Sequence, residues 1–107
     1  MRFRRRPFDI ILEAVHYGPD GRTIAWARGY ERLFSHYTDR RIFTRQDLIR
    51  ALRQGKRIAV GQRRPLMGNQ FAIQGEVVLA PHGSDLWLVT KGTPQDAPRE
   101  LAGVPHL

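Results

Sequence analysis

Residues 8–32, FDIILEAVHYGPDGRTIAWARGYER, contain the first two predicted strands of this protein and the turn between them. Side chains alternate along residues 8–17 with a period of two and some apolar character on both faces, which is typical of a β-strand. Residues 18–21, Gly-Pro-Asp-Gly, favour a turn, because proline presets φ, aspartate bonds the local backbone and the last glycine accepts positive φ. Residues 23–32 resume the period of two. We therefore predict an antiparallel hairpin near the start of the chain.

The returning strand has one bulky face and one nearly bare face. The bulky face carries Ile24, Trp26, Arg28 and Tyr30, and the other carries alanine and glycine. Large aromatic side chains usually contribute to the core. In a basic domain they can instead form a platform on which nucleic-acid bases stack. The sequence leaves both outcomes open for Trp26 and Tyr30, and equally for Trp87.

One helix is predicted over residues 45–54. Thr44 is a good N-cap residue, Asp47 stands at the third helical position, and Gly55 is suited to end the helix. At about 100° per residue, the leucines, isoleucine and alanine of this segment share one face and the arginines lie on the opposite one. The helix is therefore expected to cover a sheet with its apolar face.

Three more strands are predicted after the helix, at residues 57–64, 70–79 and 85–90, each bounded by glycine or proline. Residues 33–42 lack periodicity and are expected to form a loop, with room for a short edge strand at 41–43. The order strand, strand, helix, strand, strand, strand predicts an α+β fold. It fits either a small antiparallel sheet or a partly open barrel of about five strands with one helix.

The chain length and composition fit one globular domain. The sequence has 107 residues, of which 41% are hydrophobic and 26% are charged, and it contains no cysteine. We expect a basic N-terminal arm at 1–7 and a single domain at 8–90. Glycine and proline with few large apolar residues at 91–107 predict a poorly ordered tail.

The net charge is the clearest functional signal. It is +8 at pH 7, and of the eighteen cationic side chains only Lys56 and Lys91 are lysine. Arginine binds phosphate through its planar fork and stacks on aromatic rings, which favours a nucleic-acid partner. A genome rich in arginine codons, or selection for heat stability, would give the same excess without such a partner.

No pattern indicates catalysis, a cofactor or a metal. The four histidines stand in different segments, and Asp9 and Glu13 would be about 13 Å apart on one strand. Gly55-Lys56-Arg57 is not a phosphate loop, because it follows a helix instead of preceding one and lacks the hydroxyl residue. We expect a binding protein that is not an enzyme and needs no cofactor.

Two short resemblances are also weak. Arg28-Gly29-Tyr30 resembles the opening of the RNA-recognition-motif signature, but Glu31 and Arg32 depart from it and the chain offers one helix where that fold has two. Residues 5–8 resemble the start of an export signal, but acidic residues interrupt the apolar stretch that should follow. No segment is predicted to span a membrane, and the cytoplasm is the expected location.

These observations predict a nucleic-acid-binding domain that uses arginine and aromatic side chains, with single strands as one candidate ligand. The alternative is a protein-interaction or assembly module with an acidic partner and an incidental basic surface, which should carry an apolar patch, for example around Phe71 and Trp87. The oligomeric state and the choice between DNA and RNA stay open. The candidate binding residues are Arg28, Tyr30, Tyr37, Arg40, Arg41, Arg50, Arg53, Lys56, Arg57, Arg63 and Arg64.

Overall fold

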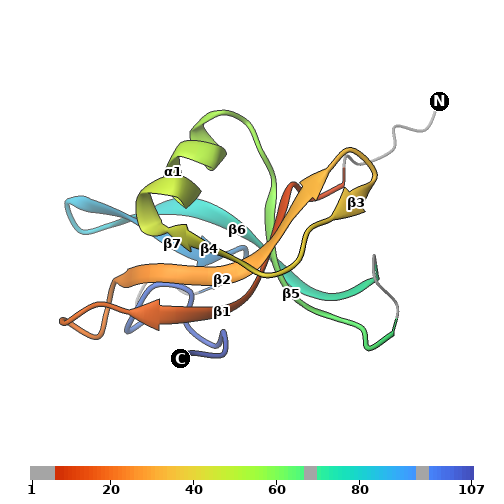
Figure 1. Cartoon of the computed structure of the whole chain (residues 1–107). Helices are drawn as coiled ribbons and strands as arrows, with labels where there is room; N and C mark the ends of the chain where they lie inside the picture. Colours follow the sequence, from red (N-terminus) through yellow and green to blue (C-terminus); the bar gives the residue numbers. More distant parts are fainter. Residues whose placement is uncertain (1–6, 67–69, 94–96) are drawn as a thin grey trace.

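The computed structural model describes residues 7–66, 70–93 and 97–107. In these ranges the chain forms one helix and a mixed, curled sheet that resembles half a barrel (Figure 1). The elements in chain order are β1 (Ile10–Tyr17), β2 (Ile24–Leu33), β3 (His36–Tyr37), β4 (Arg41–Thr44), α1 (Arg45–Arg53), β5 (Ile58–Arg63), β6 (Phe71–His82) and β7 (Asp85–Thr90). The α+β class, the helix and the order of the five main strands confirm the prediction.

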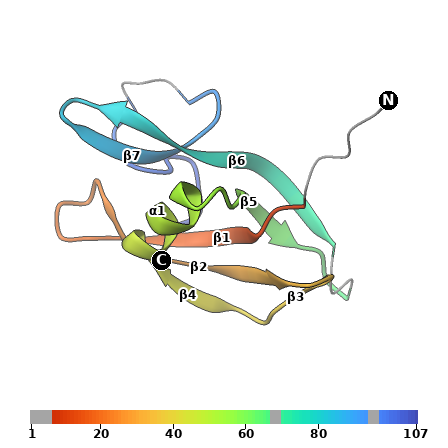
Figure 2. The same ribbon diagram turned by 90° about the horizontal axis from the view of Figure 1, so that it is seen from above.

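The sheet has the strand order β3-β2-β1-β5-β6-β7, and β4 also pairs with β2. Its strand pairs are antiparallel except for β1 and β5, which run parallel. The prediction of an antiparallel sheet is wrong at this pair. Parallel neighbours need a crossover, and here the chain passes through β4 and α1 before β5 returns beside β1. Figure 2 shows α1 lying between the β6–β7 hairpin and the β2–β4 side of the curled sheet.

Side chains close in sequence stabilise the first turn and the start of α1, as predicted. In the first turn, the Asp20 carboxylate accepts hydrogen bonds from the backbone amides of Arg22 and Thr23 at 2.9 and 3.0 Å. At the start of α1, Thr44 and Asp47 form a reciprocal capping box, in which each side chain accepts a bond from the other's backbone amide. Both features are confirmed, and the helix ends one residue earlier than predicted.

The main core lies between the sheet and α1. It contains Leu12, Val15, Ile24, Ala27, Phe43, Leu48, Ile58, Val60, Val77, Leu88, Leu101 and Val104. The opposite face of the sheet is also covered in its middle, where Ile11 and Ala59 are buried. At Gly29 a Cβ atom would clash with the Ile11 carbonyl oxygen, so glycine permits the close approach of β2 to β1 there.

The C-terminal segment is part of the folded domain. Leu101 and Val104 are buried in the core, and the Leu107 amide donates to the Val15 carbonyl at 2.8 Å. For residues 97–107 the prediction of a poorly ordered tail is therefore wrong. Composition suggested disorder, but the buried side chains of Leu101 and Val104 and the hydrogen bonds of Glu100 to other elements anchor the segment. Residues 94–96 of the predicted tail and residues 1–6 of the predicted basic arm lie outside the described residues.

Glu100 connects this segment to three other elements. Its fully buried carboxylate accepts hydrogen bonds from the backbone amides of Ile24 in β2 and Leu88 in β7, at 2.9 and 2.8 Å. The Arg45 guanidinium at the start of α1 adds two bonds of 2.8 and 2.9 Å. This hydrogen bonding raises the pKa of Arg45, although partial burial opposes the shift. All the acceptor positions face a donor, as a buried carboxylate requires.

Candidate nucleic-acid interface

The eleven predicted residues do not form one continuous surface. Five of them gather around Glu13 on the face of the sheet opposite α1, and Arg57 lies apart at the start of β5. Three others line a groove beside α1, and the last two, Arg53 and Arg64, are exposed elsewhere. Some of the candidate binding residues therefore already make packing contacts or ion pairs within the protein, whereas others lie on open surface where a ligand can reach them.

Glu13 organises the first group. Its carboxylate is buried and accepts a hydrogen bond of 2.6 Å from the Tyr30 hydroxyl. Arg28 and Arg40 each donate from Nε at 2.8 Å. Burial alone would raise the pKa of Glu13, but the hydrogen bonds from Tyr30 and Arg40 outweigh it and hold the pKa below its ordinary value. Arg28 and Arg40 are thus partly neutralised, although Arg40 remains largely exposed.

Tyr30 is part of the interior and is not an exposed stacking platform. Its side chain is 3% exposed, and the Arg63 guanidinium lies over its ring at 4.2 Å from the centroid. Phe71 meets the same ring edge-on at 5.2 Å. The ends of β5 and β6 therefore cover the face of β2 that carries Tyr30, and a base cannot reach this ring without displacing them.

Arg63 and Tyr37 complete this packed cluster. Arg63 donates from Nη2 to the carbonyl oxygens of Thr38 and Tyr37 at 2.9 and 3.3 Å, and the Tyr37 hydroxyl donates to the Phe8 carbonyl at 2.8 Å. Within the described residues the buried Nε of Arg63 has no hydrogen-bond partner. An open hollow of about 410 Å³ adjoins the cluster and is lined by Tyr30, Asp39, Arg40 and Arg63.

Arg57 is one of the predicted binding residues, but it already has a structural partner. Its side chain is 16% exposed and forms an ion pair with Glu76 at 3.2 Å. The guanidinium also lies 4.3 Å from the centroid of the Phe8 ring. The hydrogen bond from Arg57 lowers the pKa of Glu76, against a smaller opposing effect of burial. Arg57 and Arg63 thus both contribute to packing.

Arg41, Arg50 and Lys56 converge on one open groove of about 390 Å³. We call it the α1 groove. Its walls come from β4, from one side of α1 and the residues that follow it, and from the start of β1 and the end of β2. The other lining residues are Ile10, Glu31, Ile42, Phe43, Asp47, Ala51 and Gln54.

Local structure brings the three cations together. Pairing of β4 with β2 places Arg41 opposite Gly29, and Arg50 lies in the last turn of α1. Gly55, with φ of 84°, then turns the chain so that Lys56 follows at the groove.

Electrostatically, the α1 groove is positive and only partly neutralised. Arg41 pairs with Glu31 at 2.6 Å, with both side chains partly exposed. Arg50 approaches Asp47 only to 3.9 Å, and within the described part of the chain Lys56 forms no ion pair. Exposed pairs of this kind contribute little to stability, so a ligand phosphate can replace their carboxylates at small cost.

Arg53 lies on the other side of α1. It lines a second open groove of about 530 Å³ together with Arg45, Asp85 and Trp87. Arg45 is already bound to Glu100, and Asp85 offsets the remaining charge, so this groove is less positive than the α1 groove. Arg64 is exposed at the end of β5 and lines neither groove.

Sequence reasoning missed one exposed aromatic residue. Phe34 lies at the tip of the β2–β3 hairpin and is 93% exposed, the highest value for an aromatic side chain in the described ranges. Trp87 is 5% exposed and stacks on His82, and Trp26 stacks on His16. Residues 33–42 were predicted as a loop because they lack periodicity, but His36 and Tyr37 form β3. The turn before β3 contains none of the glycine or asparagine that usually marks a tight hairpin.

No protein-family model matches the sequence, and neither the curated proteins nor the solved structures include a match to it. In the described part of the chain, no helix is long and apolar enough to cross a membrane. The same residues contain no group of three or more histidine and carboxylate side chains placed to hold a metal ion. Function is therefore inferred from the chemistry of the surface.

Proposed function

We propose that this protein is a nucleic-acid-binding domain and that the α1 groove contacts the phosphate backbone. The observation that carries the proposal is the convergence of Arg41, Arg50 and Lys56 on one open groove. Guanidinium and ammonium groups on a groove wall are the usual means of holding phosphates independently of base sequence.

The distribution of carboxylates supports this role for the groove. All four glutamates of the chain form ion pairs with arginine, and Glu13 and Glu100 are buried while doing so. The acidic side chains are thus largely committed to structural contacts, whereas Arg50 and Lys56 are not tightly paired. These two cations are therefore available on the described surface, where they attract a polyanion.

The alternative, a protein-interaction module, depended on an exposed apolar patch around Phe71 and Trp87. Trp87 is 5% exposed, and Phe71 packs against Tyr30 and Tyr37 with ring centroids 5.2 and 4.9 Å away. These two rings therefore do not form an exposed apolar patch, although Ile73 and Leu86 near them are 44% and 43% exposed, and the convergence of cations on the α1 groove favours nucleic-acid binding.

The test compares two variants that lose the same charge. Arg50→Gln with Lys56→Gln removes two cations from the α1 groove, and Arg64→Gln with Lys91→Gln removes two exposed cations elsewhere. Anisotropy of labelled single-stranded and duplex DNA and RNA is measured between about 50 and 200 mM salt, a range over which phosphate contacts weaken strongly. The first variant should lower the slope of log affinity against log salt by up to about 1.4 to 1.8, and the second should change it little.

Two results would contradict the proposal. Equal effects of the two variants would mean that binding reports only the net charge and that the groove has no special role. Absence of binding by the unchanged protein at about 50 mM salt would exclude a nucleic-acid partner, because electrostatic contacts are strong under that condition.

A further inference from the structure

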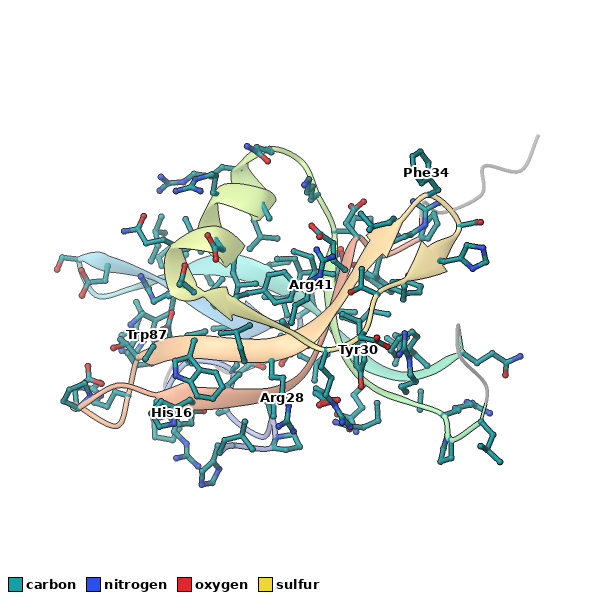
Figure 3. The ribbon with its side chains drawn as sticks, in the orientation of Figure 1. His16, Arg28, Tyr30, Phe34, Arg41 and Trp87 are labelled. Carbon is teal, nitrogen blue, oxygen red and sulfur yellow. The ribbon has the colours of Figure 1, made fainter. Side chains whose placement is uncertain are left out.

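The β2–β3 hairpin presents a single aromatic ring at its tip. Leu33 pairs with His36, so Phe34 and Ser35 form a two-residue turn. Phe34 has φ of 56° and is 93% exposed. Figure 3 shows the ring at the end of the hairpin, pointing away from the body of the protein.

Folding alone does not account for phenylalanine at this position. Tight two-residue turns of this kind favour glycine, asparagine or aspartate, because positive φ is costly for a residue with a large side chain. The ring also gains almost no burial that would offset this cost. A strained backbone conformation points to a role beyond folding, and at Phe34, unlike the equally exposed Leu66 with φ of 61°, the exposed group is an aromatic ring that can stack on a ligand.

The hairpin tip lies at one end of the α1 groove. Glu31, which lines the groove and pairs with Arg41, precedes Phe34 by three residues on β2. At about 3.3 Å per residue, Phe34 lies roughly 10 Å beyond the groove along the strand. A chain of a few nucleotides whose phosphates lie in the groove would therefore place a base near the ring.

We propose that Phe34 stacks on an unpaired base and gives the domain a preference for single-stranded nucleic acid. This inference rests on the proposed nucleic-acid binding and adds the form of the ligand. An exposed aromatic ring stacks on the face of any base, so the contact needs no particular base sequence. In a duplex both faces of an internal base are already stacked, so the ring should contribute little there.

The variant Phe34→Asn tests this contact without damaging the turn. Asparagine tolerates positive φ, so the fold should be retained or slightly stabilised. Leu66→Asn is a matched control, because Leu66 is also fully exposed and has φ of 61°. Affinity for a single-stranded oligonucleotide of mixed sequence and for its duplex is measured by anisotropy at several salt concentrations, and thermal unfolding verifies the fold of both variants.

Phe34→Asn should weaken single-strand binding by about 5- to 150-fold, the range seen when one stacked aromatic is removed. The salt slope should stay unchanged, because no cation is lost, and duplex binding should also stay unchanged. Leu66→Asn should bind as the unchanged protein does. Phe34→Trp should restore single-strand affinity, because it restores an aromatic face.

Several outcomes overturn this inference. If the unchanged protein binds with a steep salt slope and Phe34→Asn binds single strands equally well, the ring makes no contact while the proposed function stands. Equal losses for single strands and duplex would mean that Phe34 does not distinguish unpaired bases. If the unchanged protein binds neither form at about 50 mM salt, the inference and the proposed function both fail.

Discussion

Glu100 is the residue at which a single substitution should affect the fold most. The change Glu100→Ala removes a fully buried carboxylate that joins the C-terminal segment to β2, β7 and α1. It leaves the Arg45 guanidinium without its counterion. It also leaves the backbone amides of Ile24 and Leu88 without their acceptor.

The expected loss is large relative to the stability of a small domain. Removing one partner of a buried ion pair costs roughly 3–5 kcal/mol, because the remaining groups stay buried and unpaired. A domain of this size has a free energy of unfolding of about 5–15 kcal/mol in total. At about 4–8 °C per kcal/mol, the thermal midpoint should fall by roughly 12–40 °C.

The assay compares Glu100→Ala with Glu31→Ala by urea and thermal unfolding. The Glu31 side chain and its partner Arg41 are partly exposed, so this control deletes the same atoms at a cost of at most about 1 kcal/mol. Amide hydrogen exchange should show loss of protection at Ile24 and Leu88 in the first variant only. If Glu100→Ala were as stable as the control, the C-terminal segment would not be anchored as described, and the reasoning would be refuted.

Two further predictions concern the predicted cations and the acidic side chains that hold them. Because the folded-state pKa of Glu13 lies below its ordinary value, its carboxylate contributes stability above about pH 4.5 that is lost as pH falls through the lowered pKa. Thermal midpoints measured from pH 6 to about pH 3 should therefore fall less steeply for Glu13→Gln, and parallel curves would contradict this role. Arg57→Ala combined with Arg63→Ala should lower the thermal midpoint clearly, because both side chains pack on aromatic rings and hold acceptors. An unchanged midpoint with weaker nucleic-acid binding would instead make these two arginines part of the interface.

The features predicted correctly depend on residues that are close in sequence. The capping box needs only Thr44 and Asp47, and the first turn needs only residues 18–23. The parallel pairing of β1 with β5 joins segments almost fifty residues apart, and no local pattern specifies it. Its cause is the crossover through β4 and α1, which is a property of the whole chain.

For the candidate site, the sequence indicated arginine as the kind of side chain involved but could not distinguish one arginine from another. Arg57 and Arg50 look alike in a sequence, yet Arg57 is paired with Glu76 and covered, while Arg50 is exposed beside a groove. The difference arises because Glu76 lies opposite Ala59 in the neighbouring strand, next to Arg57. Phe34 was missed for a related reason, since the turn that exposes it lacks the usual turn residues.

Composition and short-range patterns alone determined the α+β class, the first hairpin, the single helix and the large positive charge. The class, the hairpin and the helix follow from local backbone preference, and the charge follows from counting the charged side chains. The tertiary structure determined which arginines are free, which aromatic rings are buried and where the C-terminal segment lies. These outcomes depend on contacts such as Arg45 with Glu100 and Arg63 with Tyr30, between residues far apart in the chain. Such contacts exist only where the folded sheet brings distant segments together, so no local sequence pattern specifies them.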